Sequence, residues 1–329
     1  MFEWGSSVAF SVISQTISGG IAAELMPLDD LSEQPLLAPA EGKWRWGHRH
    51  LDALEHNLIE TFSDPANQAV IRADLDAESG YHVFSISSVP AVRGFAEDFT
   101  HSVADIAKNL QPALDQMAWQ LACDFAPSGT PRDPKAVKFP IADSPSTWKK
   151  AEQRTGVQFR PEHWDFIEHF QPYRGVDGWA DSWQGNYVHP LAFLRDLTDE
   201  DKHRVSQPVF LMPQQFDFAR FHFVERRDGT KDWIVTGIGK PLELGLEVMR
   251  ARLTGSAQPE INPAGSCRPQ VTFSTGDQAA AALRRVERFV HLIFSEFARK
   301  FPTLTARAES PLSGPCDAPP QCLAAGYRQ

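Results

Sequence analysis

The sequence predicts an α+β fold, with a core of long helices and a small antiparallel β portion inserted before the last helix. Apolar residues recur every three or four positions through residues 94–124 and again through residues 277–301, as in amphipathic helices. Between them, residues 205–275 contain runs in which apolar and polar side chains alternate, which is typical of strands. Two long helices so far apart in sequence bury their apolar stripes most simply against each other.

Three regions are expected along the chain. Residues 1–42 show little periodicity and contain several Pro, Gly and Asp residues, which predicts a loosely ordered N-terminal arm. Residues 43–302 are predicted to form a single α+β domain, with its β-rich insert at about 205–275. Residues 303–329 are rich in proline and poor in apolar anchors, which predicts a disordered tail.

The first half of the domain is predicted to contain two helices and a hairpin. Apolar spacing predicts helices over residues 43–62 and 94–124, and Pro112 should kink the second. Residues 69–89 have the pattern of two strands joined by a turn at Glu78-Ser79-Gly80. This hairpin either joins the β portion or lies over the helices.

Prolines predict where the shorter helices of the second half begin. Pro145, Pro161 and Pro190 each precede a helical pattern, and the fixed φ of proline suits the first turn of a helix. Strands are then expected in FDFARFHFV, DWIVTGIG and RPQVTFS, before the final helix at about 277–301.

The composition is that of a soluble globular protein. Of the 329 residues, 42% are hydrophobic and 22% are charged, which argues against a disordered or membrane-spanning chain. The formal net charge is −10, and residues 1–125 carry 18 acidic but only 6 basic side chains. Proteins that coat nucleic acid non-specifically usually have a basic excess, so we do not expect that activity. A small basic pocket is still compatible with this balance, because net charge does not describe a local site.

Cysteine usage favours a reducing compartment. The four cysteines include no C-x-x-C pair. In a chain of this length, four such cysteines do not form the pattern of a disulfide framework. The N-terminal residues lack the basic segment that begins a signal peptide, and no apolar stretch approaches the ~20 residues of a spanning helix. We therefore expect a cytoplasmic protein that does not enter membranes.

The most informative polar segment is Asp201-Lys202-His203-Arg204, which we call the DKHR segment. His203 is the candidate catalytic residue, because imidazole titrates near neutral pH and can act as a general acid or base. Lys202 and Arg204 could hold a phosphate or carboxylate group. The alternative is a structural ion-pair hub, since the segment closes a helix and the helix dipole favours cations there.

The polar side of the 94–124 helix supplies the rest of the predicted ligand-binding set. His101 and Asp105 are one turn apart, and Asn109 and Asp115 lie on the same side of the helix. Arg204 could pair with Asp105 or Asp115, which would bring these side chains to the DKHR segment. The alternative for His101 and Asp105 is a hydrogen bond at the surface.

No metal ion or cofactor is predicted. His48, Asp52 and His56 lie four residues apart on one helix face, and two imidazoles with a carboxylate could bind zinc. No fourth ligand can be named, so an exposed polar face is the preferred interpretation. The sequence also lacks phosphate-binding glycine loops, the zinc-protease motif and the calcium-binding loop.

Four ordered segments resemble an uncharacterised family of bacterial proteins: AKNLQPALDQ (107–116), KFPI (138–141), IEHFQPY (167–173) and LAFLRDLTDEDKHR (191–204). The resemblance brings no established activity. The family's usual Arg-x4-His helix is similar to the R-x4–6-H motif of HEPN-type ribonucleases, which are helical. Here Gln111 and Gln116 stand at those positions, and neither amide can act as a general base or carry a positive charge. Other R-x4–6-H pairs, such as Arg284/His291, do not exceed what composition predicts by a meaningful margin.

Two hypotheses of function follow. The first is a cytoplasmic protein that binds a small ligand or a protein partner, in which the DKHR segment is structural or holds the ligand. The alternative is a hydrolase that acts on RNA or a nucleotide, with His203 as general acid/base. The glutamines at 111 and 116, the acidic balance and the lack of a metal motif favour the first hypothesis.

Overall fold

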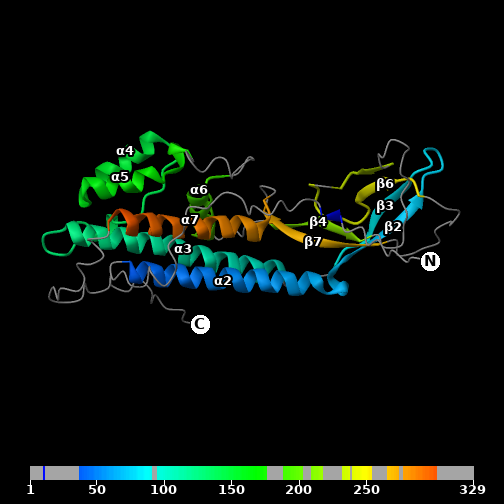
Figure 1. The fold of residues 1–329 in the computed structure, drawn as a ribbon, viewed down its shortest axis with the longest axis horizontal. Helices are drawn as coiled ribbons and strands as arrows, with labels where there is room; N and C mark the ends of the chain where they lie inside the picture. Colours follow the sequence, from blue (N-terminus) through cyan, green and yellow to red (C-terminus); the bar gives the residue numbers. More distant parts are fainter. Residues whose placement is uncertain are drawn as a thin grey trace. The chain divides into compact units, whose positions relative to one another are not determined.

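The computed structural model describes residues 10–11, 37–90, 95–175, 188–202, 209–217, 232–237, 239–253, 265–273 and 277–301. Its elements confirm the α+β class: long helices and one antiparallel sheet (Figure 1). The chain divides into two compact units, which are described separately. The first comprises Met1–Gly19, Leu51–Val103 and Arg204–Leu283, and the second comprises Gly20–His50, Ala104–His203 and Arg284–Gln329.

Three long helices contribute residues to both units. They are α2 (Ala38–Ser63), α3 (Phe95–Phe125) and α7 (Ala279–Lys300). α2 begins at Ala38, before the predicted start at residue 43, because Pro39 is compatible with the first helical turn. α3 continues on both sides of Pro112, so this proline does not end the helix.

The first unit contains a seven-stranded sheet with the order β1-β4-β7-β2-β3-β6-β5, in which all neighbours pair antiparallel. The strands are β1 (Phe10–Ser11), β2 (Ala69–Leu75), β3 (His82–Ser88), β4 (Val209–Asp217), β5 (Trp233–Val235), β6 (Glu247–Ala251) and β7 (Gly265–Phe273). The predicted hairpin, β2 and β3, joins this sheet, and β2 pairs with β7. The β portion is therefore larger than an insert before the last helix.

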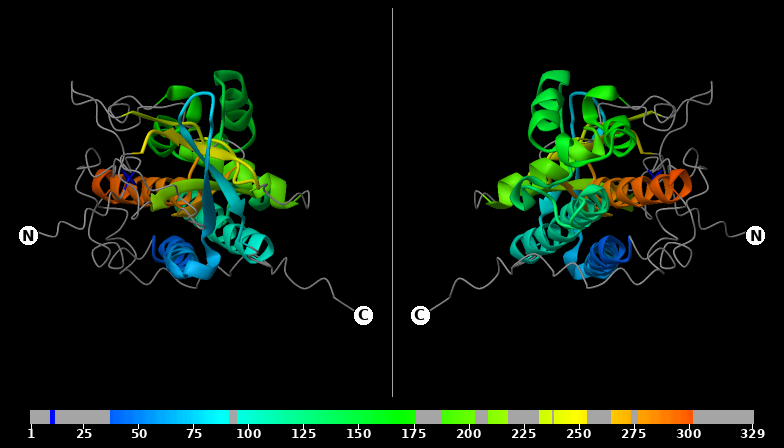
Figure 2. Two further views of the ribbon diagram at one scale, coloured as in Figure 1. Left: turned by 90° about the vertical axis from the view of Figure 1, so that its right-hand side faces the viewer. Right: turned by 90° about the vertical axis from the view of Figure 1, so that its left-hand side faces the viewer.

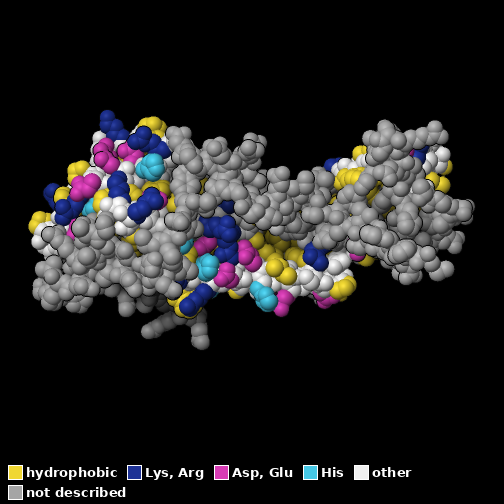
Figure 3. Space-filling model, viewed as in Figure 1, with side chains coloured by type: hydrophobic (Ala, Val, Ile, Leu, Met, Phe, Trp, Pro, Cys, Tyr) yellow, Lys and Arg dark blue, Asp and Glu magenta, His cyan; other side chains and the backbone are white. Residues whose placement is uncertain are grey.

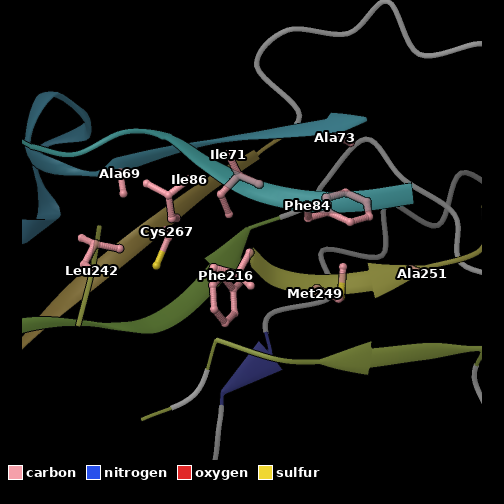
Figure 4. Close-up of a cluster of buried hydrophobic side chains, with 11 residues drawn as sticks. Ala69, Ile71, Ala73, Phe84, Ile86, Phe216, Leu242, Met249, Ala251 and Cys267 are labelled. Atoms are coloured by element: carbon pink, nitrogen blue, oxygen red, sulfur yellow. The ribbon is translucent and has the colours of Figure 1, made fainter. Parts of the chain in front are cut away.

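One face of the sheet carries the apolar core of the first unit. Alternate residues of β2 are buried, as the two-residue period of a strand requires. Figure 4 shows these side chains beside those of the other strands: Ala69, Ile71, Ala73, Phe84, Ile86, Phe216, Leu242, Val248, Met249, Ala251 and Cys267 form one buried cluster.

The strand predicted in FDFARFHFV differs from the structure. β4 runs from Val209 to Asp217, so it includes only the first two residues of that run, and residues 218–231 lie outside the described part of the chain. Pro213 in β4 lies opposite Pro269 in β7, and the register shifts between Pro213 and Gln215. A bulge accommodates proline in a strand because proline has no N–H for the ladder. Because of these prolines, the sequence pattern did not predict β4.

The second unit is helical. Besides its stretches of α2, α3 and α7, it contains α4 (Pro145–Arg154), α5 (Pro161–His169) and α6 (Pro190–Lys202), which begin at the three predicted prolines. The stretches of α2, α3 and α7 lie side by side (Figures 1 and 2). The apolar residues expected to pair α3 with α7 are all buried, at 4% exposure or less: Ile106, Leu110, Leu114, Val286, Phe289 and Ile293.

Candidate functional site

A polar cluster joins α2 to α7 within the second unit. His48 Nδ1 on α2 lies 3.1 Å from Glu287 Oε1 on α7. Arg284, one turn earlier on α7, places Nη1 3.5 Å from Glu287 Oε2 and 3.3 Å from His48 Nδ1. The Glu287 side chain is 4% exposed, whereas Arg284 and His48 retain 17% and 33%. A buried carboxylate thus lies beneath two cationic or titratable groups that reach solvent.

Contacts of Trp44 and Gly47 hold this cluster in place. Trp44, which is buried, stacks on His48 with ring centroids 5.2 Å apart and packs against His291 at 4.7 Å. Its indole N–H donates to the backbone carbonyl of Glu287 at 3.2 Å. Gly47 lets α2 approach α3, since a Cβ there would lie only 2.9 Å from Leu110 Cδ2. We call Trp44, His48, Arg284, Glu287 and His291 the α2–α7 cluster.

The charge around the cluster is opposite in sign to that of the whole chain. Residues 41–50 and 284–291 together carry six Lys or Arg side chains and two Glu side chains, a formal net of +4 in a protein of net −10. Both acids have partners: Glu41 pairs with Arg45 at 2.5 Å, and Glu287 pairs with His48 and Arg284. Figure 3 shows basic, acidic and His side chains grouped over these stretches of α2 and α7.

Burial governs the protonation of the buried acid. Desolvation raises the pKa of Glu287 above its ordinary value, and the cationic influence of His48, Arg284 and Arg288 opposes this rise. The cluster therefore combines fixed positive charge with groups that can exchange a proton. Guanidinium and imidazole groups in this arrangement suit a tetrahedral anion such as phosphate.

The structure describes only part of the predicted DKHR site. Asp201 and Lys202 are the last two residues of α6, and nothing is described of their side chains. His203 and Arg204 lie outside the described residues. The role of the DKHR segment therefore stays a prediction.

The predicted polar side of α3 is described in full. His101 and Asp105 are exposed, and Asn109 donates from Nδ2 to the backbone carbonyl of Asp105 at 2.7 Å. Asp115 instead has a structural contact: its Oδ1 accepts the backbone N–H of Phe139 at 2.9 Å. At 1.5 Å per residue, His101 and Asp115 are about 21 Å apart along the helix axis.

The segments that carry the family resemblance meet around residues 138–143. Asp115, from the first segment, binds the Phe139 amide of the second. Gln171, from the third, is fully buried and accepts the N–H of Ala142 at 2.8 Å through Oε1. Arg195, from the fourth, forms an ion pair with Asp143. These polar contacts hold residues 138–143 against α3, against the residues that follow α5, and against α6.

A partly buried histidine, His189, lies two residues before the fourth segment begins. His189 Nδ1 accepts the backbone N–H of Leu191 at 3.2 Å, in the first turn of α6, and its ring packs edge-on against Phe289 at 5.1 Å. Desolvation lowers its pKa from 6.5 to about 4. His189 is therefore neutral at pH 7.

The metal interpretation of α2 receives no support. His48 Nδ1 contacts Glu287 Oε1. His56 instead lies with its Nε2 3.1 Å from Glu60 Oε1, in an exposed pair on α2. In the described ranges, no group of three or more His, Cys, Asp or Glu side chains could hold a metal ion. Gln111 donates to Asp115 at 3.4 Å, a contact that requires no positive charge at that position.

The α2–α7 cluster was not predicted as a site from the sequence. A signal existed: three of the six basic residues of the first 125 fall within residues 43–49, and residues 284–288 contain three arginines. When the charge is summed over a large part of the chain, neither group of basic residues is visible in the total. The burial of Glu287 beside His48 depends on a contact between residues 239 positions apart. No local sequence pattern predicts such a contact.

Comparison with known proteins adds no assignment. No family model, no curated protein and no solved structure matches this chain. Within the described residues, no helix combines the length and the apolar character needed to cross a membrane.

Proposed function

We propose that this protein binds a small phosphate-bearing ligand at the α2–α7 cluster. The observation that carries the proposal is the position of Arg284 and His48, both partly exposed, above the buried Glu287. Arginine and histidine donors are suited to phosphate, and the local net of +4 favours a ligand with more than one negative charge. The local basic excess covers only two short stretches, residues 41–50 and 284–291, which favours a small ligand over a long polyanion.

The experiment is calorimetric titration of the full chain with inorganic phosphate and pyrophosphate at low ionic strength. Pyrophosphate should bind more tightly, because it carries more charge. Arg284→Gln should lower the affinity by about 10- to 150-fold, since a hydrogen bond to a charged group contributes about 1.5–3 kcal/mol. Arg284→Lys, which keeps the charge but not the planar group, should have a smaller effect.

Arg299 provides a matched control. It lies on the same helix and pairs with Glu296 three residues earlier, as Arg284 pairs with Glu287 three residues later, but its side chain is 69% exposed and lies outside the cluster. Arg299→Gln should leave the affinity unchanged. The proposal is wrong if neither anion binds at millimolar concentration, or if both variants weaken binding equally.

We further propose a cytoplasmic location and membership of the bacterial family that the four segments resemble. Cysteine usage supports the first, and the order of the four segments supports the second. The second candidate function is the hydrolase that acts on RNA or a nucleotide through His203. Hydrolysis of either substrate by the wild type, abolished in His203→Gln, would favour this candidate over simple binding.

A further inference from the structure

The solvent side of α2 carries a tryptophan that packs into no core. Of the tryptophans that the structure describes, only Trp46 has more than half of its surface exposed, at 55%. Three others are buried, with 5% exposure or less: Trp44, Trp148 and Trp164. Residues two apart on a helix are about 200° apart around its axis, so Trp46 faces away from His48 and the α2–α7 cluster.

Two cations flank Trp46 on the same face of α2. Lys43 and Arg49 stand three residues before it and three residues after it, and residues at this spacing are neighbours on a helix surface. Both cations are exposed, and the guanidinium carbon of Arg49 lies 5.3 Å from the centroid of the Trp46 ring. The ring of His50 also lies beside the indole, with centroids 6.1 Å apart. We call Lys43, Trp46, Arg49 and His50 the Trp46 face.

The cations of the Trp46 face differ from their neighbour Arg45 in having no acidic partner. Arg45 pairs with Glu41 at 2.5 Å, whereas neither Lys43 nor Arg49 forms an ion pair in the part of the chain that the structure describes. In a chain of net charge −10, these two cations leave a local positive potential around an exposed aromatic ring. The complementary ligand is an anion that also has a flat ring.

We propose that the Trp46 face binds single-stranded nucleic acid, with one base stacked on Trp46 and its flanking phosphates on Lys43 and Arg49. Along a strand, each base lies between two phosphates, which matches the order of cation, aromatic ring and cation along the helix. The two cations are about 9 Å apart along the helix axis, and their long side chains can converge on neighbouring phosphates. Stacking on aromatic rings beside cations is the usual way in which proteins bind single strands. This inference is independent of the proposed function.

The charges of α2 restrict the contact to a short stretch of nucleic acid. After residue 50 the helix carries Asp52, Glu55 and Glu60, which repel phosphate groups. The acidic chain therefore opposes the coating of long nucleic acids but accepts a contact with one stacked base. The same acids disfavour an anionic membrane surface, because a helix that lies on a membrane needs a basic polar face. In a duplex the bases stack on one another, so we expect selectivity for single strands.

The test is the fluorescence anisotropy of a short labelled oligouridylate, titrated at low salt with the full chain to about 0.1 mM, the weak end of non-specific nucleic-acid binding. Trp46→Ala should lower the affinity by about 5- to 150-fold, the range that stacking of one base on an aromatic ring gives. Trp46→Phe should retain most of the affinity, because it keeps an aromatic ring.

The salt dependence tests the two cations separately from the ring. Each phosphate neutralised on a single strand contributes about −0.7 to the slope of log K against log salt, so two contacts give about −1.4. Lys43→Gln and Arg49→Gln should each reduce the size of this slope by about 0.7, whereas Trp46→Ala should leave the slope unchanged.

Two control variants should bind the oligonucleotide as the wild type does. Lys150→Gln removes an exposed cation from α4, two residues after the buried Trp148. Ile59→Ala removes an apolar side chain of α2 that is 65% exposed but lies next to Glu60.

Four outcomes overturn the inference. Binding of heparin with equal affinity, unaffected by Trp46→Ala, would show that charge alone attracts polyanions. Equal affinity for a duplex of the same length would show that no base reaches the ring. Binding to phosphatidylserine vesicles but not to the oligonucleotide would assign the face to a membrane surface. Absence of binding up to about 0.1 mM protein would leave the face without this ligand.

Discussion

Acidification should destabilise the protein through His189. Its folded-state pKa is lowered from 6.5 to about 4 by burial, so between these values the unfolded chain binds more protons than the folded chain. The contribution of His189 to the free energy of unfolding is therefore fully present above pH 6.5, and it decreases as the pH falls towards 4. At about 1.36 kcal/mol per pH unit, the loss at pH 4 is about 3 kcal/mol from this residue. Burial also lowers the pKa of His163, which adds to the effect in the same direction.

His189→Asn isolates this contribution. The asparagine oxygen can still accept the N–H of Leu191, which lies in the first turn of α6, but it does not titrate. Urea unfolding of both proteins at pH 7, 5.5 and 4 gives the free energy of unfolding at each pH. The stability difference between pH 7 and pH 4 should be smaller in the variant by about 3 kcal/mol. An unchanged pH dependence would refute the assignment of a partly buried, neutral imidazole to this position.

Three further predictions concern stability. Gln171→Leu should cost about 1–3 kcal/mol by leaving the Ala142 amide unsatisfied, and urea unfolding should show no such loss for Gln153→Leu on the exposed face of α4. Leu114→Ala should cost about 2–5 kcal/mol through a core cavity, and a loss below 1 kcal/mol would contradict the packing of α3. In thermal melts, Arg204→Ala should destabilise more than His203→Gln if the DKHR segment is an ion-pair hub, and the opposite order would contradict that interpretation.

The helical part of the fold was predictable because its signals are local. Pro145, Pro161 and Pro190 each begin a helix, since proline both suits the first turn and interrupts what precedes it. The burial of Leu110 and Phe289 followed from the spacing of apolar residues alone. The β2–β3 hairpin was found for the same reason, but its place in the sheet depends on pairing with distant strands.

The parts that escaped prediction depend on long-range contacts. β4 contains Pro213, which argues against a central strand until its bulge opposite β7 is known. Asp115 was predicted to face a ligand or Arg204, and only the fold reveals that it binds the Phe139 amide. The α2–α7 cluster depends on Glu287, which the apolar pattern of its own helix does not distinguish from a surface acid.

The separation of the two halves of the cluster has a consequence during synthesis. His48 and Glu287 are 239 residues apart, and β2 likewise pairs with β7, which is the last strand of the sheet in chain order. A ribosome adding 5–20 residues per second needs roughly 10–50 s to pass from one to the other. During that interval the apolar faces of α2 and α3 lack their partner helix, and β2 has an open edge. We therefore expect the nascent chain to be a client for chaperones that shield apolar helices and unpaired strands until α7 emerges.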